Sequence, residues 1–492
     1  MTTRRDFLSA ALVGLTQKSD RTVAGGFVNE SHVLGHRLRD RASRPAPSRR
    51  ERVPWVIVGG GVAGLAAAWR LEKRGFDGFV VLEMEREPGG NSRWGENEIS
   101  AYPWAAHYVP VPQRGATLLR ELFDEIGLLP GGEPDERHLC HSPQERLFLH
   151  GRWQEGLEPS VGATRRDHEQ FDRFGILIEE QRATGQFTIP LATGAQPSPL
   201  DRESMAAWMA RHGLDSPYLR WYIDYACRDD YGALATDTSA WAGVHYFASR
   251  EGTETAPFTW PEGNGWIVKK LLARLGRFVR ASSPVWRIAR DGLRYRVVTE
   301  NVEYTADAVI FAAPTFLAPY LVENAAPPGF VYSPWLTANL TLDRLPRERN
   351  LEPAWDNVIY DSPSLGYVVA THQNLVVHQP RSVWTYYLAL AHSTPAEARR
   401  ALLDRDWRHW KDAILNDLAR AHPDIRACVS RVDVMRMGHA MSRPVPGFLS
   451  RPAPRAPERF WFANSDLSGI SIFEEAQYRG VRAADAALRA LG

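Results

Sequence analysis

The stretch from Trp55 to Arg93 constrains the fold most, because it joins an apolar strand, a glycine-rich turn, a helix and a second apolar strand in one short unit. Gly59, Gly61 and Gly64 have the G-x-G-x-x-G spacing. The first glycine permits a tight turn, the second lets the backbone approach a pyrophosphate, and the third lets the helix pack on the strand. The helix that begins near Ala63 offers unpaired N–H groups and the positive end of its dipole to phosphates. This order predicts a Rossmann-like α/β fold that binds a dinucleotide.

The second strand ends at Glu83, where an acid is expected to accept the ribose hydroxyls of the nucleotide. A glycine pair, Gly89 and Gly90, follows it closely. In this order the features resemble the FAD-dependent amine oxidase and phytoene desaturase superfamily. The resemblance implies FAD as the cofactor and adds Gly90, Asn91 and Arg93 to the expected binding residues. In that superfamily an arginine usually follows the glycine pair. Here Asn91 takes that position, so either Asn91 or Arg93 is expected to reach the diphosphate.

Later segments resemble the same superfamily in their order, and they imply one discontinuous FAD-binding domain interrupted by an α+β substrate domain. The segment at Val285 is expected to give backbone contacts to adenine. Near the C-terminus a strand leads past Asp466 into a helix that starts near Ile472 and Phe473. In the superfamily these segments hold the ribityl chain and the carbonyl edge of the flavin, so these three residues are expected to bind the cofactor. The expected FAD-binding domain comprises residues 53–100, 262–320 and 430–492, and the expected substrate domain comprises residues 101–261 and 321–429.

The residues that carry the reaction are less well marked. Residues 101–108 resemble the superfamily segment that passes the flavin ring, which makes His107 the candidate catalytic residue. A packed aromatic loop in which His107 bonds to backbone is the alternative. The amine oxidase branch commonly has a lysine near flavin N5, but no lysine lies between Pro314 and Trp335. A polar cluster, Asp229 to Tyr231, could face a cationic substrate or lie solvated at a helix end.

Three functions stay open. The first is an FAD-dependent oxidoreductase that oxidises an amine by hydride transfer to the flavin, with oxygen or a quinone or redox protein as electron acceptor. The missing lysine is also compatible with a desaturase or dehydrogenase of a hydrophobic, isoprenoid-like molecule. The third is a non-enzymatic binding scaffold on the same fold. The net charge of +1 gives no electrostatic reason to expect nucleic acid. Neither the three cysteines nor the histidines show metal-ligand spacing, and the oligomeric state stays open.

The N-terminus resembles an export signal. Met1 to Leu15 reads MTTRRDFLSAALVGL, a twin-arginine pair followed by a short apolar run. Residues 1–30 are therefore expected to be a twin-arginine signal and the protein to be periplasmic or otherwise exported. A basic N-terminus of a cytoplasmic protein is the alternative. Residues 31–52, rich in arginine, serine and proline, are expected to form a linker. No stretch reaches the about 20 apolar residues that a membrane-spanning helix needs.

Overall fold

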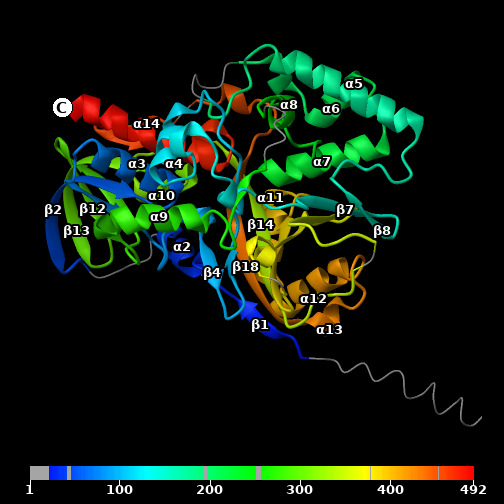
Figure 1. Cartoon of the computed structure of the whole chain (residues 1–492). Helices are drawn as coiled ribbons and strands as arrows, with labels where there is room; N and C mark the ends of the chain where they lie inside the picture. The colour runs from blue at the N-terminus through cyan, green and yellow to red at the C-terminus, as the bar shows by residue number, and fades with distance from the viewer. Residues whose placement is uncertain are drawn as a thin grey trace, which may run out of the picture.

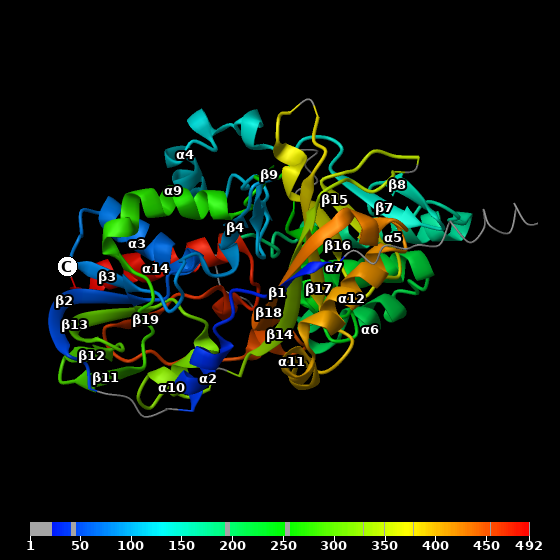
Figure 2. The ribbon, with the colours of Figure 1, turned by 90° about the horizontal axis from the view of Figure 1, so that it is seen from below.

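The computed structural model describes residues 22–40, 46–191, 197–250, 256–327, 329–348, 350–376, 378–452 and 454–491. Two large sheets, each with its own helices, lie side by side (Figure 1). The view from below shows the smaller sheet and its helices on one side and the larger sheet on the other (Figure 2). The α/β fold predicted from the sequence is confirmed.

The first sheet has seven strands in the order β10-β3-β2-β13-β12-β11, with β19 beside the end of β13. Its central strands β3, β2 and β13 are parallel. Residues 55–58 of β2 are buried on both faces, which explains their continuous apolar run. The strands are β2 (Arg49–Val58), β3 (Phe79–Leu82), β10 (Val279–Arg280), β11 (Arg287–Asp291), β12 (Arg294–Val298), β13 (Val302–Phe311) and β19 (Phe460–Phe462).

Helices cover both faces of this sheet. One face packs against a core that includes the small residues of the first long helix and the C-terminal helix. The opposite face packs against two shorter helices. The first group comprises α3 (Val62–Lys73), α4 (Thr117–Glu125), α9 (Gly265–Leu275) and α14 (Phe473–Leu491), and the second comprises α2 (His32–Arg39) and α10 (Ala318–Leu321).

The second sheet has eight strands in the order β1-β18-β14-β17-β16-β15-β7-β8. The long strands β14 and β18 run antiparallel beside the edge strand β1 and reach toward the first sheet (Figure 1). β7 and β8 form a hairpin about His150 and Gly151. The strands are β1 (Ala24–Phe27), β7 (Glu145–Leu149), β8 (Arg152–Glu155), β14 (Val331–Leu342), β15 (Asp356–Ile359), β16 (Gly366–Val369), β17 (Ser382–Ala389) and β18 (Val429–Arg443).

Two groups of helices flank the second sheet. One group packs directly on one face and shares its core. The other forms a helical layer with a core of its own above the opposite face. The first group is α11 (Pro395–Asp404), α12 (Trp407–Leu418) and α13 (Ile425–Cys428), and the second is α5 (Arg165–Arg182), α6 (Met205–Arg211), α7 (Pro217–Tyr231) and α8 (Ala240–Ala248). Between the two large sheets lie two small ones, β4 (Trp94–Glu96) with β5 (Ala101–Pro103) and β6 (Tyr108–Val109) with β9 (Phe258–Thr259).

Both N-terminal segments predicted from the sequence, the signal and the linker, contain regular secondary structure. Residues 24–27, inside the expected signal of residues 1–30, form β1 and pair in parallel with β18. Glu30 forms an ion pair with Arg436 of β18, which fixes this segment to the second sheet. The expected linker of residues 31–52 contains α2 and the start of β2, because Leu38 is buried and β2 pairs with β13 from Arg49 onward. Residues 1–21, which carry the twin-arginine pair, lie outside the described residues.

Two further elements lie across the domain limits expected from the sequence. β18 falls mostly within the expected FAD-binding segment 430–492 and pairs with β14 of the second sheet along its length. α4 lies within the expected substrate segment 101–261, yet Leu122 and Phe123 of α4 are buried in the core of the first sheet's domain. In the described residues no helix is both long and apolar enough to cross a membrane.

Candidate active site

A long cavity runs along the carboxyl ends of the central parallel strands of the first sheet, and we call it the first cavity. It begins where β2 and β3 end and continues to the N-terminus of α14. Ligands of open α/β sheets bind at this edge. Of the predicted cofactor residues, all but Gly64 line it: Gly59, Gly61, Ala63, Glu83, Gly90, Asn91, Arg93, Val285, Asp466, Ile472 and Phe473.

The glycine turn has the geometry that its spacing predicts. Gly59 has a φ of +102°, a conformation that glycine adopts at little cost. A Cβ at Gly61 would meet only the backbone of Gly90, at 3.8 Å, so this position leaves room for a ligand to approach. A Cβ at Gly64 would lie 1.9 Å from the Gly59 carbonyl oxygen. Gly64 therefore serves the close packing of α3 on the turn, which explains its absence from the cavity wall.

Glu83 holds the turn as well as facing the cavity. Its carboxylate accepts hydrogen bonds from the backbone N–H of Gly60, at 2.6 Å, and of Glu85, at 2.8 Å. Burial raises the pKa of Glu83, and these two N–H groups oppose that rise because they favour the charged form. The carboxylate therefore sits at the end of β3, where the ribose acid was predicted.

The first cavity contains an acceptor that the protein leaves unsatisfied. Oδ2 of Asp466 accepts hydrogen bonds from the backbone N–H of Thr315 and the hydroxyl of Tyr332, both at 2.7 Å. Oδ1 of Asp466 is buried and has no partner among the described residues. A buried polar atom without a partner is costly, so it calls for a ligand donor. A ribityl or other polyol chain has such donors, and Asp466 thus fits the cofactor role predicted for it. Burial raises its pKa to about 6.

The structure separates the roles of Asn91 and Arg93. The side-chain amide of Asn91 donates a 2.7 Å hydrogen bond to the carbonyl oxygen of Ala440 on β18. Arg93 donates through Nε to the carbonyl oxygen of Gly90, at 3.1 Å, and its guanidinium lies 3.6 Å from the carboxylate of Glu85. Both side chains therefore have protein partners as well as positions on the cavity wall.

A second cavity adjoins the first. The residues that line both come from the glycine-pair turn, the loop after β5, β18 and the start of α14: Asn91, Ala106, Ala440, Ser471, Ile472 and Phe473. We call these six residues the shared wall. The small side chains of Ala106 and Ala440 let backbone approach a planar ring there. The N-terminus of the 19-residue helix α14 brings a positive dipole end to the same place.

Carboxylates dominate the charge of the second cavity. Four line it, Asp229, Asp230, Asp356 and Glu474, against one cation, Arg250. Arg250 donates to Asp230 at 2.8 Å. In the described part of the chain the other three carboxylates form no ion pair.

Burial shifts the pKa of these carboxyl groups upward, since a charged group is disfavoured away from water. The pKa of Asp229 rises to about 7, first through burial and then through the neighbouring Asp230. The pKa of Glu474 also rises to about 7 for the same leading reason. That of Asp356 rises well above its usual value. A cation in this cavity would favour the charged forms and reverse these shifts.

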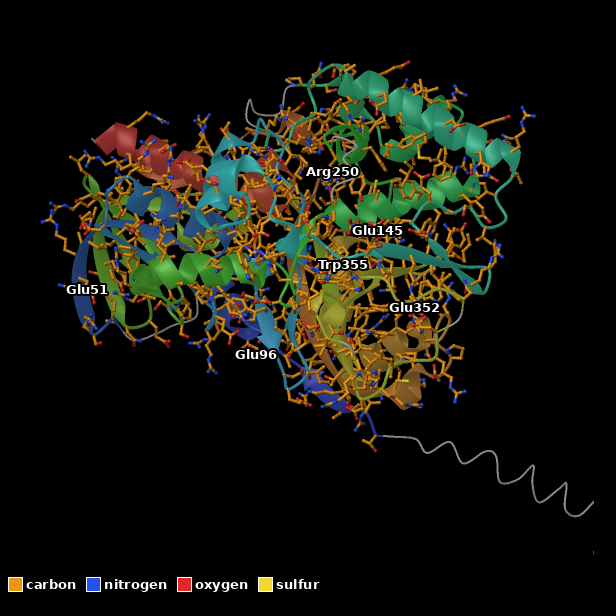
Figure 3. All side chains as sticks on the ribbon, in the orientation of Figure 1. Glu51, Glu96, Glu145, Arg250, Glu352 and Trp355 are labelled. Atoms are coloured by element: carbon orange, nitrogen blue, oxygen red, sulfur yellow. The ribbon has the colours of Figure 1, made fainter. Side chains whose placement is uncertain are left out.

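A third cavity continues from the second and adds Glu145, Trp355, Arg114 and Arg120 to the wall. Figure 3 shows Glu145, Trp355 and Arg250 close to α7, between the helical layer and the second sheet. Burial raises the pKa of Glu145 too. Asp229, Asp356 and Glu474 therefore line both cavities, and the third cavity places arginines beside these acids.

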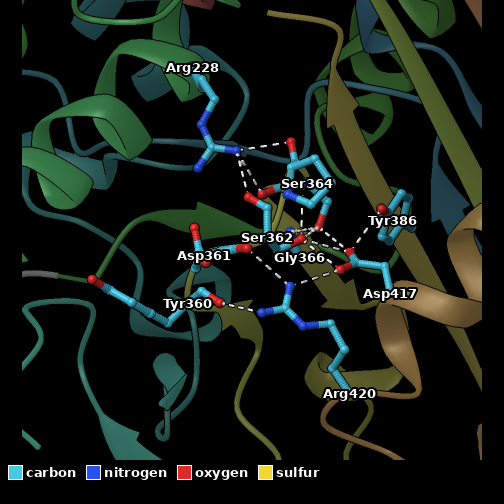
Figure 4. Close-up of polar contacts among 10 residues, drawn as sticks. Arg228, Tyr360, Asp361, Ser362, Ser364, Gly366, Tyr386, Asp417 and Arg420 are labelled. Carbon is cyan, nitrogen blue, oxygen red and sulfur yellow. Dashed lines mark hydrogen bonds and ion pairs between the residues drawn. The ribbon is translucent and has the colours of Figure 1, made fainter. Parts of the chain in front are cut away.

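Arg228, one residue before Asp229, fixes the end of α7 that carries the acids. Its Nη1 donates to the carbonyl oxygens of Ser362, Pro363 and Ser364, at 3.1, 2.9 and 3.1 Å. Figure 4 shows this contact and the network behind it. There the hydroxyls of both serines and of Tyr386 donate to the Asp417 carboxylate of α12, at 2.7 to 3.0 Å. The position of Asp229 is thus tied to the sheet and to α12.

His107 lines the second and third cavities and not the first. Its Nδ1–H donates to the carbonyl oxygen of Ala105 at 3.2 Å, and its ring lies 4.7 Å from that of Tyr387. Burial lowers the pKa of His107 to about 4, so the imidazole is neutral near pH 7. Its predicted catalytic role stays a prediction.

Sequence reasoning missed most of the acidic residues that line the second and third cavities. It noted Asp229, Asp230 and Tyr231 as one polar cluster, and the structure divides them. The two acids line the second cavity, while the Tyr231 hydroxyl donates to the carbonyl oxygen of Ala242 inside the helical layer. Glu474 reads in sequence as an ordinary acid in the first turn of a helix. Within the described ranges, no group of three or more histidine, cysteine or acidic side chains is placed to hold a metal ion.

Comparison with known proteins assigns most of the chain to one family. The profile of the flavin-containing amine oxidoreductase family matches residues 62–488. A zeta-carotene-forming phytoene desaturase of Myxococcus xanthus is 27% identical over 298 residues, 56% of this chain and 55% of the relative. A Baeyer–Villiger monooxygenase of Penicillium patulum is 30% identical over 142 residues, 28% of this chain and 21% of that protein. The chain therefore spans about half or less of the length of these relatives.

Solved structures share the fold. A redesigned putrescine oxidase has a TM-score of 0.67 at 16% identity, with 89% of this chain and all of that chain covered. The cyclohexylamine oxidase of Brevibacterium oxydans has a TM-score of 0.64 at 16% identity, with 89% of this chain and 99% of that chain covered. At this identity the likeness establishes the fold.

Proposed function

The chain belongs to the flavin-containing amine oxidoreductase family, and from that premise we propose that it oxidises an amine by hydride transfer to the flavin. It is a flavin oxidoreductase, and its cofactor is FAD. The scaffold function is thereby set aside. The proposal concerns the substrate, for which the amine and the apolar, isoprenoid-like molecule were the two candidates.

The observation that carries the proposal is a set of three acidic residues in the cavities beside the cofactor site, Asp229, Asp356 and Glu474, which we call the acidic wall. Glu474 is only 6% exposed, lines the second and third cavities, and forms no ion pair among the described residues. Asp229 and Asp356 also line both cavities and form no ion pair among the described residues. Burying unpaired carboxyl groups is unfavourable, and a ligand cation would offset that cost. An apolar polyene would leave them desolvated and unpaired, so the wall favours an amine.

The residues of the wall suggest how the amine is prepared. An amine arrives mainly as an ammonium ion, and it must lose a proton before a hydride can leave the carbon next to nitrogen. Glu474 follows Phe473 of the shared wall, and its pKa of about 7 suits proton acceptance near neutral pH. We assign this proton to the Glu474 carboxylate. Asp229 and Asp356 then hold positive charge elsewhere on the substrate. FAD, when bound, accepts the hydride equivalent.

An anaerobic substrate panel tests the proposal. The purified protein with FAD is mixed with mono- and diamines, aromatic amines, amino acids and an apolar polyene, and loss of the oxidised-flavin absorbance is followed. Reduction by one or more amines, with the imine or its aldehyde as product, supports the proposal. Reduction by the polyene alone supports the desaturase function and contradicts it.

We also propose export through the twin-arginine pathway, on the basis of Arg4 and Arg5 and the apolar run that follows. The test is fractionation of cells that produce the chain and its Arg4→Lys/Arg5→Lys variant. Periplasmic protein that disappears in the variant supports export. Equal cytoplasmic accumulation of both contradicts it.

The electron acceptor of the reduced flavin is oxygen or a quinone or redox protein. It is identified by adding each of these to the reduced protein and measuring the rate at which the flavin is reoxidised.

A further inference from the structure

The first cavity holds one nucleophile that neither cofactor recognition nor the proposed chemistry uses, the imidazole of His439. It lines this cavity directly beside Ala440 of the shared wall. The nucleotide end of the cavity lies at Glu83 and Val285, so the flavin ring must occupy the opposite end, where the second cavity begins. His439 is therefore at the ring end of the site.

An irregularity of the second sheet puts His439 there. Opposite Pro334 of β14, which has no N–H to donate, the register jumps. Ser333 pairs with Met441 and Trp335 pairs with Met437, so three residues of β18 face one of β14. Such a bulge redirects side chains, and bulges occur often beside active sites. Met437 and Met441 line the second cavity, whereas His439 lines the first.

The ring of His439 is oriented but not engaged in hydrogen bonds. It stacks on Phe316 with centroids 4.3 Å apart and rings 22° from parallel, and it lies 6.0 Å from Tyr332. Neither ring nitrogen has a hydrogen-bond partner within the described residues. The residue is exposed on the cavity side of β18, and desolvation by the surrounding protein together with the nearby Arg399 lowers the pKa of His439 to about 4, so the imidazole is neutral. No cysteine or lysine lines this cavity in the described ranges, and the serine hydroxyls there are weak nucleophiles without an activating base.

We propose that His439 is a flavinylation site, at which an imidazole nitrogen is bonded covalently to the 8-methyl carbon of FAD. One C–H bond of the methyl group and the imidazole N–H bond break, and an N–C bond forms. The two hydrogens and two electrons are taken up by the flavin ring and pass to dioxygen, which becomes hydrogen peroxide. The net reaction joins histidine and FAD and consumes one dioxygen. It depends on FAD being the cofactor and is independent of the substrate.

Denaturation tests the covalent bond without measuring activity. The purified protein is incubated aerobically with FAD, denatured, and separated from small molecules by gel electrophoresis and by precipitation. Flavin fluorescence should remain with the polypeptide, and the peptide that contains His439 should gain the mass of one FAD less two hydrogens. Complete release of flavin from folded, FAD-loaded protein would overturn the proposal, as would attachment at another residue.

Two variants locate the bond. His439→Ala and His439→Gln should bind FAD, seen as a flavin spectrum in the folded protein, and release all of it on denaturation. His107→Ala is the matched control, since it removes a histidine from the neighbouring cavity and should leave the covalent flavin in place. If the His439 variants keep flavin after denaturation, the assignment is wrong. If the His439→Ala protein does not fold, the His439→Gln protein provides the same test.

Discussion

The side-chain amide of Asn91 donates a 2.7 Å hydrogen bond to the carbonyl oxygen of Ala440 and so joins the glycine-pair turn to the strand from the second sheet. Both residues belong to the shared wall, where the first and second cavities adjoin. The position that an arginine usually takes in the superfamily is thus used for a domain contact.

Replacing Asn91 by alanine should weaken FAD binding. One hydrogen bond is worth about 0.5–1.5 kcal/mol, which corresponds to about a two- to tenfold higher Kd for FAD. Fluorescence titration of the apoprotein measures this change. Asn301→Ala, at an exposed position in the loop between β12 and β13, is the control and should leave the Kd unchanged. An Asn91→Ala Kd equal to that of the control would contradict the role of the bond.

Replacing Glu83 by glutamine should weaken FAD binding more strongly. The carboxylate loses its charge, and the amide puts a donor beside the N–H group of either Gly60 or Glu85. Losing hydrogen bonds to a charged group costs about 1.5–3 kcal/mol, or a Kd about 10- to 100-fold higher. The exposed Glu87→Gln is the matched control. Unchanged FAD occupancy at low flavin concentration in Glu83→Gln would refute its role.

Replacing Gly64 by alanine should destabilise the folded protein. The new Cβ would lie 1.9 Å from the Gly59 carbonyl oxygen, so α3 must move away from the turn. Overpacking of this kind costs about 1–3 kcal/mol or more, visible as a lower Tm and reduced FAD content. Gly35→Ala, in α2 and with nothing within 4 Å of the new Cβ, should be neutral or stabilising. A Tm for Gly64→Ala equal to that of Gly35→Ala would show that the close contact is tolerated.

Binding of a cation that cannot be oxidised should tighten as pH rises through about 7. Asp229 and Glu474 lose their protons there, because their pKa values are raised to about 7, and only the ionised carboxylates attract the cation. Tetramethylammonium, followed by perturbation of the flavin spectrum, is a suitable probe. Below pH 7 both groups are protonated and affinity should fall. Glu474→Gln should reduce the change of affinity with pH. Glu352→Gln is the control and should leave that change as it is, because Glu352 is exposed and lies near the edge of the domain built on the second sheet (Figure 3). An affinity independent of pH would rule out these carboxylates as the recognition site.

Local patterns predicted which residues gather at the first cavity, because the glycines and Glu83 lie within one βαβ unit whose geometry follows from spacing. The substrate site was not predictable in the same way. Asp229, Asp356 and Glu474 come from α7, β15 and α14, and only tertiary packing brings them to one cavity. The bulge that presents His439 was equally hidden, since it depends on which residue of β14 faces it. The strand that begins at Arg49 was hidden for a similar reason, because its arginine-rich start has no apolar pattern and is held by backbone pairing with β13.

The most direct test of amine oxidation compares two molecules with the same carbon skeleton, an amine that binds and the corresponding alcohol. Each is mixed anaerobically with the FAD-loaded protein, and the rate of flavin reduction is measured. We expect reduction by the amine and none by the alcohol. Replacing Glu474 by glutamine should slow reduction by about 10²- to 10⁴-fold, as expected for loss of a proton acceptor. Reduction that proceeds equally in Glu474→Gln would contradict the role of this residue, and a flavin that no amine reduces but an apolar polyene does would contradict the proposed function itself.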